Sequence, residues 1–317
     1  MWKEKYKELM FSNDASKIDT VEGGKLKLEK LPVLYKYSGI DKYSLANLSN
    51  DTAWFRNAAG FNDPYDSALS IGNRAFYEFQ HKDVLVNELS KIFQTNTEEI
   101  SKIISEFPIE EGVEKLLEEH SPIGQSVDEF KGKFKKFIKE TDELLERHST
   151  NISGSYQECV YASCFSEDPL SMLMWSHYAD NHKGMVLEYD FLNLDSSFHE
   201  ETLWALHPVL YTKELVNLNN YLEHQDKIDV PILAAISKLD KWVYEKEWRM
   251  LFLSKSEEQG KIIKLIKPKS VILGARIEQM HKIMISLDAK KKGIPVKQIK
   301  LDSTKYQLSI VDFNEFD

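Results

Sequence analysis

The sequence predicts an α+β fold: a mixed, mostly antiparallel β core flanked by helices, with a helical insertion. Short segments rich in β-branched and aromatic residues occur in two stretches, 31–75 and 151–317. Between them, residues 76–150 lose these strand signals and carry Leu, Ile and Phe at helical spacing. Because the first stretch has too few strands for a complete sheet, we expect both stretches to build one core domain. Residues 1–30 are polar and charged, and we expect a short helix and a loop there.

The composition fits a globular chain and excludes several classes of protein. With 42% hydrophobic and 29% charged residues, the 317-residue chain is too apolar to be disordered. Its net charge of −10 argues against general duplex DNA binding, which depends on Lys and Arg that neutralise phosphates. The N-terminus has no apolar signal segment, and no run approaches 18 apolar residues. These features predict a cytoplasmic protein without a membrane-spanning helix.

The two cysteines, Cys159 and Cys164, are too few for a disulfide framework or a four-cysteine zinc site. Their spacing of five on an expected strand would place them on opposite faces. We therefore expect two reduced thiols in the core.

Local signals predict the elements up to the end of the insertion. The segments before it are a strand at 31–37, a helix at 44–49, a strand at 53–56 and a turn at 60–66. Roughly four helices are expected within the insertion. The sequences at 95–98 and 126–129 have the pattern of capping boxes that open two of them.

After the insertion, a strand is expected at 159–165 and a helix follows it. Asp168 can cap this helix, which would continue to Ala179 and end before Gly184 in a left-handed conformation. The remaining expected elements are strands at 185–190, 206–211, 249–253, 270–274, 296–300 and 308–311, and helices at 230–242 and 278–292.

The densest polar cluster is the segment 176–184. His177 and Asp180 lie three residues apart, so they share a face of the expected helix. The cluster suits a ligand-binding turn with His177 and Tyr178 in a cleft lined by Trp175 or Trp248. It also suits a general acid or base, with His177 oriented by Asp180, or a purely structural helix end. A metal site of His177, Asp180 and His182 is disfavoured, because this is no zinc spacing, and we expect no metal.

A second cluster, at 241–249, brings two carboxylates close to an arginine. Glu245, Glu247 and Arg249 alternate, so in an extended chain they point to the same side. A carboxylate beside a guanidinium stays ionised, which suits a base or a stabiliser of positive charge. We expect Glu247 to be the structural partner of Arg249 and Glu245 to be the functional carboxylate. A purely structural ion-pair network is the alternative.

Two further segments carry candidate ligand contacts. Asn62 and Asp63 lie in the turn and could bind a ligand hydroxyl or a cation, or simply form the turn. On the strand 34–37, alternation places Tyr35 and Tyr37 on one face and Lys36 on the other. Motifs of P-loop, Rossmann, serine hydrolase and zincin proteins are missing from the sequence.

Taken together, several segments resemble a bacterial family of uncharacterised function known as DUF2971. They are Leu-Tyr-Lys-Tyr at 34–37, Phe-Asn-Asp-Pro at 61–64, the Cys-Phe-Ser-Glu to His-Lys-Gly stretch at 164–184, Tyr-Glu-Lys-Glu-Trp-Arg at 244–249, and 267–274. The resemblance covers roughly residues 31–311, with the helical insertion as its variable part.

More distantly, the layout is similar to ADP-ribosyltransferase-like proteins. In this resemblance 34–37 supplies the first motif, His177 and Tyr178 the middle one, and Glu245 or Glu247 the last. Lys36 stands where those proteins have an Arg or His, so a phosphate contact would fall to its ammonium. The resemblance implies NAD as the first substrate to test.

The leading hypothesis is a nucleotide- or NAD-directed transferase or glycohydrolase, acting as a bacterial toxin or phage-defence effector. Its catalytic residues would be Glu245, His177 and Tyr178. Its substrate-binding residues would be Tyr35, Lys36, Tyr37, Asn62, Asp63, Trp175, His182 and Arg249. One alternative is a non-catalytic ligand-binding or sensor module whose helical insertion contacts a protein partner. A second is a Mg²⁺-dependent nuclease using Asp63, Asp66 and Glu245.

Overall fold

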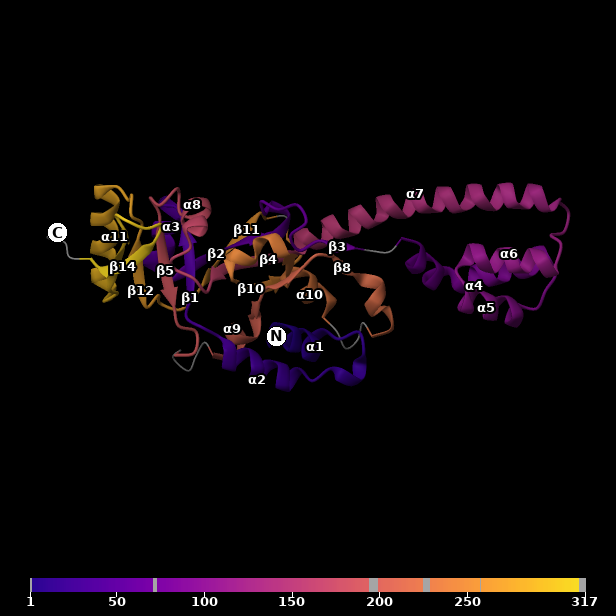
Figure 1. Cartoon of the computed structure of the whole chain (residues 1–317), viewed down its shortest axis with the longest axis horizontal. Helices are drawn as coiled ribbons and strands as arrows, with labels where there is room; N and C mark the ends of the chain where they lie inside the picture. Colours follow the sequence, from indigo (N-terminus) through magenta and orange to yellow (C-terminus); the bar gives the residue numbers. More distant parts are fainter. Residues whose placement is uncertain (1, 71–72, 194–198, 225–228, 257, 314–317) are drawn as a thin grey trace. The chain divides into compact units, whose positions relative to one another are not determined.

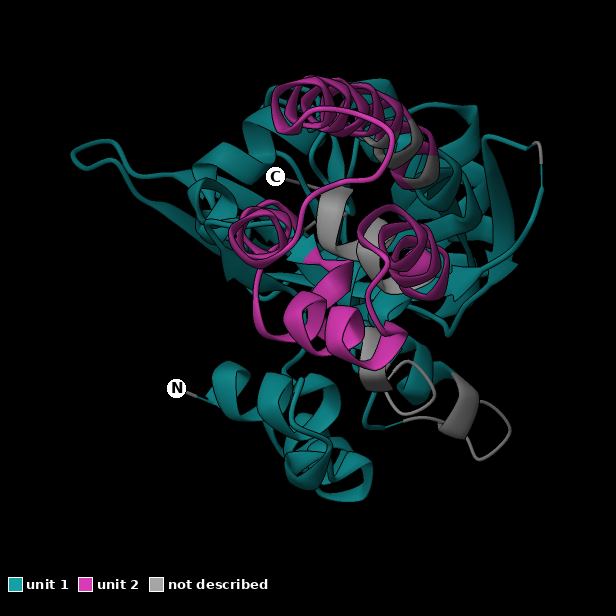
Figure 2. Ribbon diagram, turned by 90° about the vertical axis from the view of Figure 1, so that its right-hand side faces the viewer, with its two compact units in different colours: residues 1–68, 155–216, 223–317 teal, residues 69–154, 217–222 magenta. Residues whose placement is uncertain are grey.

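The computed structural model confirms the α+β fold: a mostly antiparallel sheet flanked by helices (Figure 1). It describes residues 2–70, 73–193, 199–224, 229–256 and 258–313. The chain divides into two compact units, coloured teal and magenta in Figure 2. Unit 1 comprises residues 1–68, 155–216 and 223–317, and unit 2 comprises residues 69–154 and 217–222.

Unit 1 is built on a 10-stranded sheet whose neighbours are antiparallel except for one parallel pair, β12 and β13. Its main path runs β11 (Gly260–Lys264), β2 (Thr52–Asn57), β4 (Val160–Ser166), β1 (Leu34–Ser38), β5 (Met185–Tyr189), β12 (Ser270–Leu273), β13 (Val296–Leu301), β14 (Leu308–Asp312). Beside this path, β10 (Glu247–Leu253) pairs with β4 and with β6 (Leu206–Pro208).

Strand β4 is where the sheet opens. One edge of β4 pairs with β10 along its whole length. On the other edge, β2 pairs with Tyr161 and Ala162, whereas β1 pairs only at Ser166. Residues 163–165 therefore lie between two strands that approach the same edge of β4 from opposite ends. This opening positions the cleft described below.

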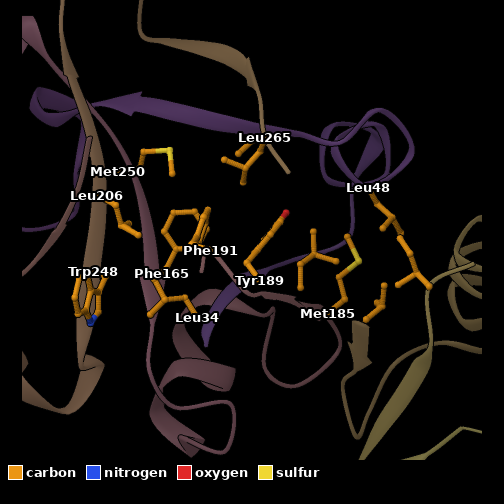
Figure 3. Close-up of a cluster of buried hydrophobic side chains, with 14 of the residues drawn as sticks. Leu34, Leu48, Phe165, Met185, Tyr189, Phe191, Leu206, Trp248, Met250 and Leu265 are labelled. Atoms are coloured by element: carbon orange, nitrogen blue, oxygen red, sulfur yellow. The ribbon is translucent and has the colours of Figure 1, made fainter. Parts of the chain in front are cut away.

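Alternating side chains build a core on each face of the sheet. On one face, Leu34, Phe165, Tyr189 and Trp248 pack into the larger cluster (Figure 3). Four helices contribute apolar residues to it: α1 (Trp2–Phe11), α3 (Lys42–Asn50), α9 (His199–Ala205) and α11 (Gln279–Lys292). On the other face, α8 (Met172–Tyr178) places Trp175 against Tyr37 and Val186. Helix α8 therefore lies on the same face of the sheet as the cleft, and it contributes side chains to the cleft lining.

Unit 2 is helical and has a core of its own. Its helices are α4 (Asn73–Phe93), α5 (Thr97–Glu106), α6 (Ile109–Glu119) and most of α7 (Val127–Cys159). Phe93, Ile100, Leu116 and Phe130 pack together in its interior. The cap of α5 is Asn96, which accepts from the backbone N–H of Glu98, and not Thr95 as the capping-box pattern predicts. Ser126 accepts from the backbone N–H of Glu129, as expected at the start of α7.

The N-terminal segment differs from the expected helix and loop. A second helix, α2 (Thr20–Lys30), follows α1 and lies beside it, with Asp19 accepting from the backbone N–H of Glu22 at its start. Gly23 and Gly24 lower the intrinsic helix propensity, so local signals favour a loop. The helix forms nevertheless, because α2 packs against α1. Gly23 allows this close approach, since a Cβ there would lie 2.6 Å from the Met10 sulfur.

Three other expectations are corrected by tertiary contacts. The helix expected at 230–242 ends early: α10 (Val230–Ile236) is followed by β9 (Ser237–Leu239) and the 3₁₀ helix η4 (Asp240–Glu245). Strand β9 forms because it pairs in parallel with β7 (Leu210–Thr212).

Strand β11 was not expected and pairs with β2. Cys159 ends α7 and is not in a strand, and both cysteines are free and half-buried.

The end of α8 also differs from the expected pattern. Ser171 caps it, because its hydroxyl accepts from Met174 N–H, whereas Asp168 accepts from Leu170 N–H in the preceding turn. The left-handed residues are Asp180, Asn181 and His182, and not Gly184. Gly184 is required for space instead, because a Cβ there would lie 2.2 Å from the carbonyl oxygen of Ser38.

Short elements complete the described chain: η1 (Ala15–Lys17), η2 (Ala58–Gly60), β3 (Leu69–Ser70), β8 (Val216–Asn217) and η3 (Leu218–His224). Among the described residues, no helix combines the length and the apolar character needed to cross a lipid bilayer.

We expect unit 1 to fold after residues 70–152 are replaced by a flexible Gly-Ser linker of about six residues. The cut ends are adjacent, because Leu69 N–H donates to the Ser153 hydroxyl at 3.1 Å. The shortened chain should show one cooperative thermal transition by circular dichroism, with the full-length chain as control. A remainder that aggregates or melts without cooperativity would show that the insertion completes the core.

Candidate functional site

A cleft of about 590 Å³ opens in unit 1 where β1 and β2 diverge along β4. This volume is in the usual range for small-molecule sites, roughly 300–1,000 Å³. The lining combines aromatic and ionisable side chains, including Tyr35, Lys36, Tyr37, Trp54, Arg56, Phe61, Asn62, Asp66, Cys164, His177, Tyr178, Lys238, Glu245, Glu247 and Arg249. The cleft thus gathers residues from segments that are far apart in the sequence.

Strand register positions the charged floor of the cleft. On β10, Glu247 and Arg249 face the same side and lie opposite Ser166 and Cys164 of β4. Glu245 is not part of this extended segment, contrary to the sequence-based expectation. It ends η4, and Lys246 has a φ of 45° that turns the chain before β10 begins. The Ser166 hydroxyl holds this turn by donating to the Glu245 carbonyl at 2.6 Å.

Arg249 is fully buried, and all five of its N–H donors are bound within the protein. Its terminal nitrogens donate to both oxygens of Asp66, at 2.6 and 2.7 Å. Nε and one terminal nitrogen donate to Glu247, at 2.8 and 3.1 Å, and another bond reaches the carbonyl of Ala235 at 2.7 Å. Arg249 therefore has no donor left for a substrate, and its expected substrate-binding role is wrong. Glu247 is the glutamate that pairs with it.

Lys238 is a second buried cation in this cluster. Its ammonium lies 2.5 Å from Glu245, 2.9 Å from Glu247 and 3.7 Å from Asp66. Burial by itself would lower the pKa of Lys238, but the surrounding carboxylates outweigh burial and raise it. Lys238 therefore stays charged and ties Glu245 to the Arg249 network.

The two glutamates have opposite electrostatic environments. Burial disfavours the charge of Glu247, but Arg249 and Lys238 outweigh it and hold the pKa of Glu247 far below its usual range. Burial and the charge of Glu247 raise the pKa of Glu245, and the bonds from Lys238 and Tyr178 only partly offset this. Arg249 is not the cation beside Glu245, contrary to expectation, because its donors are bound to Asp66 and Glu247; Lys238 has this place.

Tyr178 and His177 reach the cleft from the end of α8. The Tyr178 hydroxyl donates to Glu245 Oε1 at 2.7 Å, and burial together with the Glu245 charge raises the pKa of the phenol. His177 is exposed, and its Nδ1 lies 3.4 Å from the Tyr244 hydroxyl. The expected partner of His177, Asp180, is itself exposed and in left-handed backbone. Tyr178 and Glu245 therefore form the bonded pair, with His177 beside them.

Four of the expected ligand contacts also line the cleft: Tyr35, Lys36, Tyr37 and Asn62. The Lys36 ammonium reaches into the opening of the sheet and donates to the Cys164 carbonyl at 3.3 Å. Burial lowers the pKa of Lys36. The Tyr37 hydroxyl is already used, because it donates to the Asp168 carbonyl at 2.6 Å. Asn62 is exposed at the rim.

Three expected substrate contacts are elsewhere. Trp175 is fully buried, and its indole N–H donates to the Pro169 carbonyl at 2.8 Å. His182 stacks on Trp175 with ring centres 6.2 Å apart, so it belongs to the packing of α8. Asp63 accepts from the Trp242 indole at 2.8 Å and from the Tyr65 backbone, which makes it a turn residue. Trp248, the other expected wall of the cleft, lies in the larger core.

Trp54, Arg56 and Lys238 also line the cleft, although the sequence did not indicate them as site residues. The sequence around Lys238 predicts a helix and does not mark it as a cleft residue. Lys238 lies instead on β9, which forms by pairing with β7. Trp54 and Arg56 alternate with the buried Ala53 and Phe55 on β2, so a period-two pattern could have identified their shared face.

The carboxylates of the nuclease hypothesis are engaged by protein donors. Asp66 is bound through both oxygens to Arg249, Asp63 is bound to Trp242, and Glu245 accepts at both oxygens. These contacts give no support to a Mg²⁺ site at this position.

Within the described ranges, the group of three His, Cys, Asp or Glu residues whose ligand-type atoms all lie within 4.8 Å of one another is Glu99, Glu119 and His120 in unit 2. His177 and His182 are in no such group. The Glu99 set is exposed or half-exposed, as many acidic surface groups are without a metal.

Replacing Arg249 by Met should lower the free energy of unfolding by about 3–5 kcal/mol, because Asp66 and Glu247 would become unpaired buried charges. Urea denaturation monitored by fluorescence measures this. Arg147→Met, on the exposed surface of α7, is the matched control and should change stability by less than about 0.5 kcal/mol. Equal stability of the two variants would contradict the assigned role of Arg249.

Part of the cleft lining lies in a segment that is similar to a known protein family. Residues 174–250 match the family model described as "Protein of unknown function (DUF2971)". This segment extends from α8 to β10 and includes His177, Tyr178, Lys238, Glu245 and Arg249. No curated protein and no solved structure matched the chain. Over residues 174–250 the chain is therefore similar to the DUF2971 family, which agrees with the resemblance noted in the sequence.

Proposed function

We propose that this chain is a nucleotide-directed transferase or glycohydrolase in which Glu245 is the catalytic carboxyl group. The observation that carries the proposal is the state of Glu245 at the wall of the cleft. Its side chain is buried, its pKa is raised, and Tyr178 and Lys238 hold its two oxygens. Perturbed carboxyl groups in clefts are typical of catalytic sites.

A carboxylate with a raised pKa suits a general base. In the proposed step, Glu245 takes the proton of an attacking hydroxyl, which belongs to water or to an acceptor molecule. The hydroxyl oxygen forms a bond to the anomeric carbon while the bond from that carbon to the leaving base breaks, and the base keeps the electron pair. The negative charge of Glu245 also stabilises the positive charge that develops at the anomeric carbon.

Tyr178 and His177 have supporting roles in this proposal. Tyr178 orients Glu245 through the 2.7 Å hydrogen bond, and its raised pKa keeps the phenol protonated so that it remains a donor. His177 is exposed beside the cleft and is available to contact the substrate or the leaving group. Lys36 is the cation that would meet a substrate phosphate.

NAD is the first substrate to test, by the similarity to ADP-ribosyltransferase-like proteins. A transferase that modifies host or phage components with ADP-ribose would act as a toxin or a phage-defence effector. The same cleft could instead bind a nucleotide without turnover, with the helices of unit 2 presenting a surface to a protein partner. Release of nicotinamide by the purified chain separates the catalytic hypothesis from this sensor hypothesis.

We predict that Glu245→Gln lowers kcat for nicotinamide release by about 10²–10⁴-fold, the usual contribution of a general base. The amide keeps the shape of the side chain, but its single oxygen can accept from Tyr178 or from Lys238 and not from both, so far-UV circular dichroism must show that the variant is folded. Glu4→Gln, on the exposed surface of α1, is the matched control. Full activity of Glu245→Gln would overturn the assignment of Glu245.

The pH dependence gives an independent prediction. The base must be ionised, so kcat/KM should rise with pH through the raised pKa of Glu245. The acid limb should therefore lie above about 4.3, the ordinary value for Glu. A rate profile recorded over the range in which far-UV circular dichroism is constant tests this. An acid limb at or below the ordinary Glu value would contradict a base at this position.

A further inference from the structure

We propose that Trp54 and Arg56 of β2, together with Lys36, bind the substrate as a nucleoside diphosphate unit. In this arrangement Trp54 stacks on an aromatic ring and the two cations bind the phosphates. The inference rests on the proposed function of the same cleft and specifies the chemical class of its substrate.

The alternation of β2 presents Trp54 and Arg56 to the cleft. Ala53 and Phe55 point into the larger core, whereas Trp54 is 42% exposed and Arg56 is exposed. Both line the cleft. Residues two apart on a strand are separated by about 7 Å, which is close to the span between a stacked base and its phosphates. A large exposed indole beside an exposed guanidinium is therefore placed to contact both ends of a nucleotide.

Two glycines make room for these side chains. A Cβ on Gly260, the register partner of Arg56 on β11, would lie 2.2 Å from the Trp54 ring. A Cβ on Gly60 would lie 2.8 Å from Arg56 Nε. Neither glycine has a left-handed φ, so the backbone conformation does not require them. Both exposed side chains thus lie over positions without a Cβ, where a larger residue would displace them.

The cations of the cleft are of two kinds: some form ion pairs with buried carboxylates, and others have no carboxylate within 4 Å. Lys238 and Arg249 are bound to Asp66, Glu245 and Glu247. No carboxylate in the described part of the chain lies within 4 Å of the Lys36 ammonium or the Arg56 guanidinium, and the one hydrogen bond of Lys36 goes to a carbonyl.

Lys36 and Arg56, which have no carboxylate within 4 Å among the described residues, therefore line a cleft in a chain of net charge −10. Such a site attracts an anion, and the planar fork of Arg56 suits a phosphate group bidentately. The aromatic wall adds the requirement for a ring. A ligand that has both is a nucleotide, and the two cations favour a diphosphate over a monophosphate.

The test measures binding of ADP, adenosine and inorganic pyrophosphate to the full-length chain by titration calorimetry. Arg56→Gln should weaken ADP and pyrophosphate binding at least tenfold and leave adenosine binding unchanged. Trp54→Leu should weaken ADP and adenosine binding and leave pyrophosphate binding unchanged. Gly60→Ala keeps the charge of Arg56 but displaces its side chain, so it should weaken ADP binding as Arg56→Gln does.

Arg276→Gln, at an exposed position outside the cleft, is the matched control and should bind ADP as the unmodified chain does. Near-UV circular dichroism confirms that each variant is folded. The inference is overturned if the unmodified chain does not bind ADP at millimolar concentration, or if Arg56→Gln binds it as the control does.

The outcomes separate this inference from the proposed function. Binding of ADP that depends on Arg56, without any turnover of NAD, supports the inference and counts against the catalytic proposal. Turnover of NAD that Arg56→Gln and Trp54→Leu leave unchanged overturns the inference and leaves the catalytic proposal standing.

Discussion

The buried guanidinium of Arg249 is the constraint on which the site depends. A charge with no solvent exposure costs several kcal/mol unless its donors are bound and its charge is balanced. Arg249 meets this requirement with Asp66 from the turn after η2, Glu247 from its own strand and the Ala235 carbonyl from α10. Three segments separated in the sequence are thereby held on the floor of one cleft.

The chemical character of the site follows from an imbalance in this network. Arg249 and Lys238 supply two positive charges, and Asp66 and Glu247 supply two negative ones. Glu245 is a third carboxyl in the same buried cluster, so its ionisation adds an uncompensated negative charge. Burial, together with this surplus charge, raises the pKa of Glu245. Glu247 is buried too, but Arg249 and Lys238 outweigh burial and lower its pKa.

The opening of the sheet gives this charged cluster access to a ligand. Since β2 and β1 pair with opposite ends of one edge of β4, residues 163–165 leave space that a continuous sheet would fill. Lys36 occupies part of this space and donates to Cys164. The exposed face of β2, with Trp54 and Arg56, forms the adjoining wall, and the ion-paired network of Arg249 and Lys238 forms the floor.

The sequence by itself determined the α+β class, most strands and the helices of the insertion, because their signals depend on neighbours within a few residues. It also indicated that Glu247 would pair with Arg249, since the two alternate on one strand. Only the tertiary structure decided where Lys238 lies, because β9 forms by pairing with β7 and not from any local preference. It also decided the protonation chemistry of Glu245. Electrostatic coupling depends on distances between charges, and Asp66, Lys238 and Glu247 are brought together only by folding.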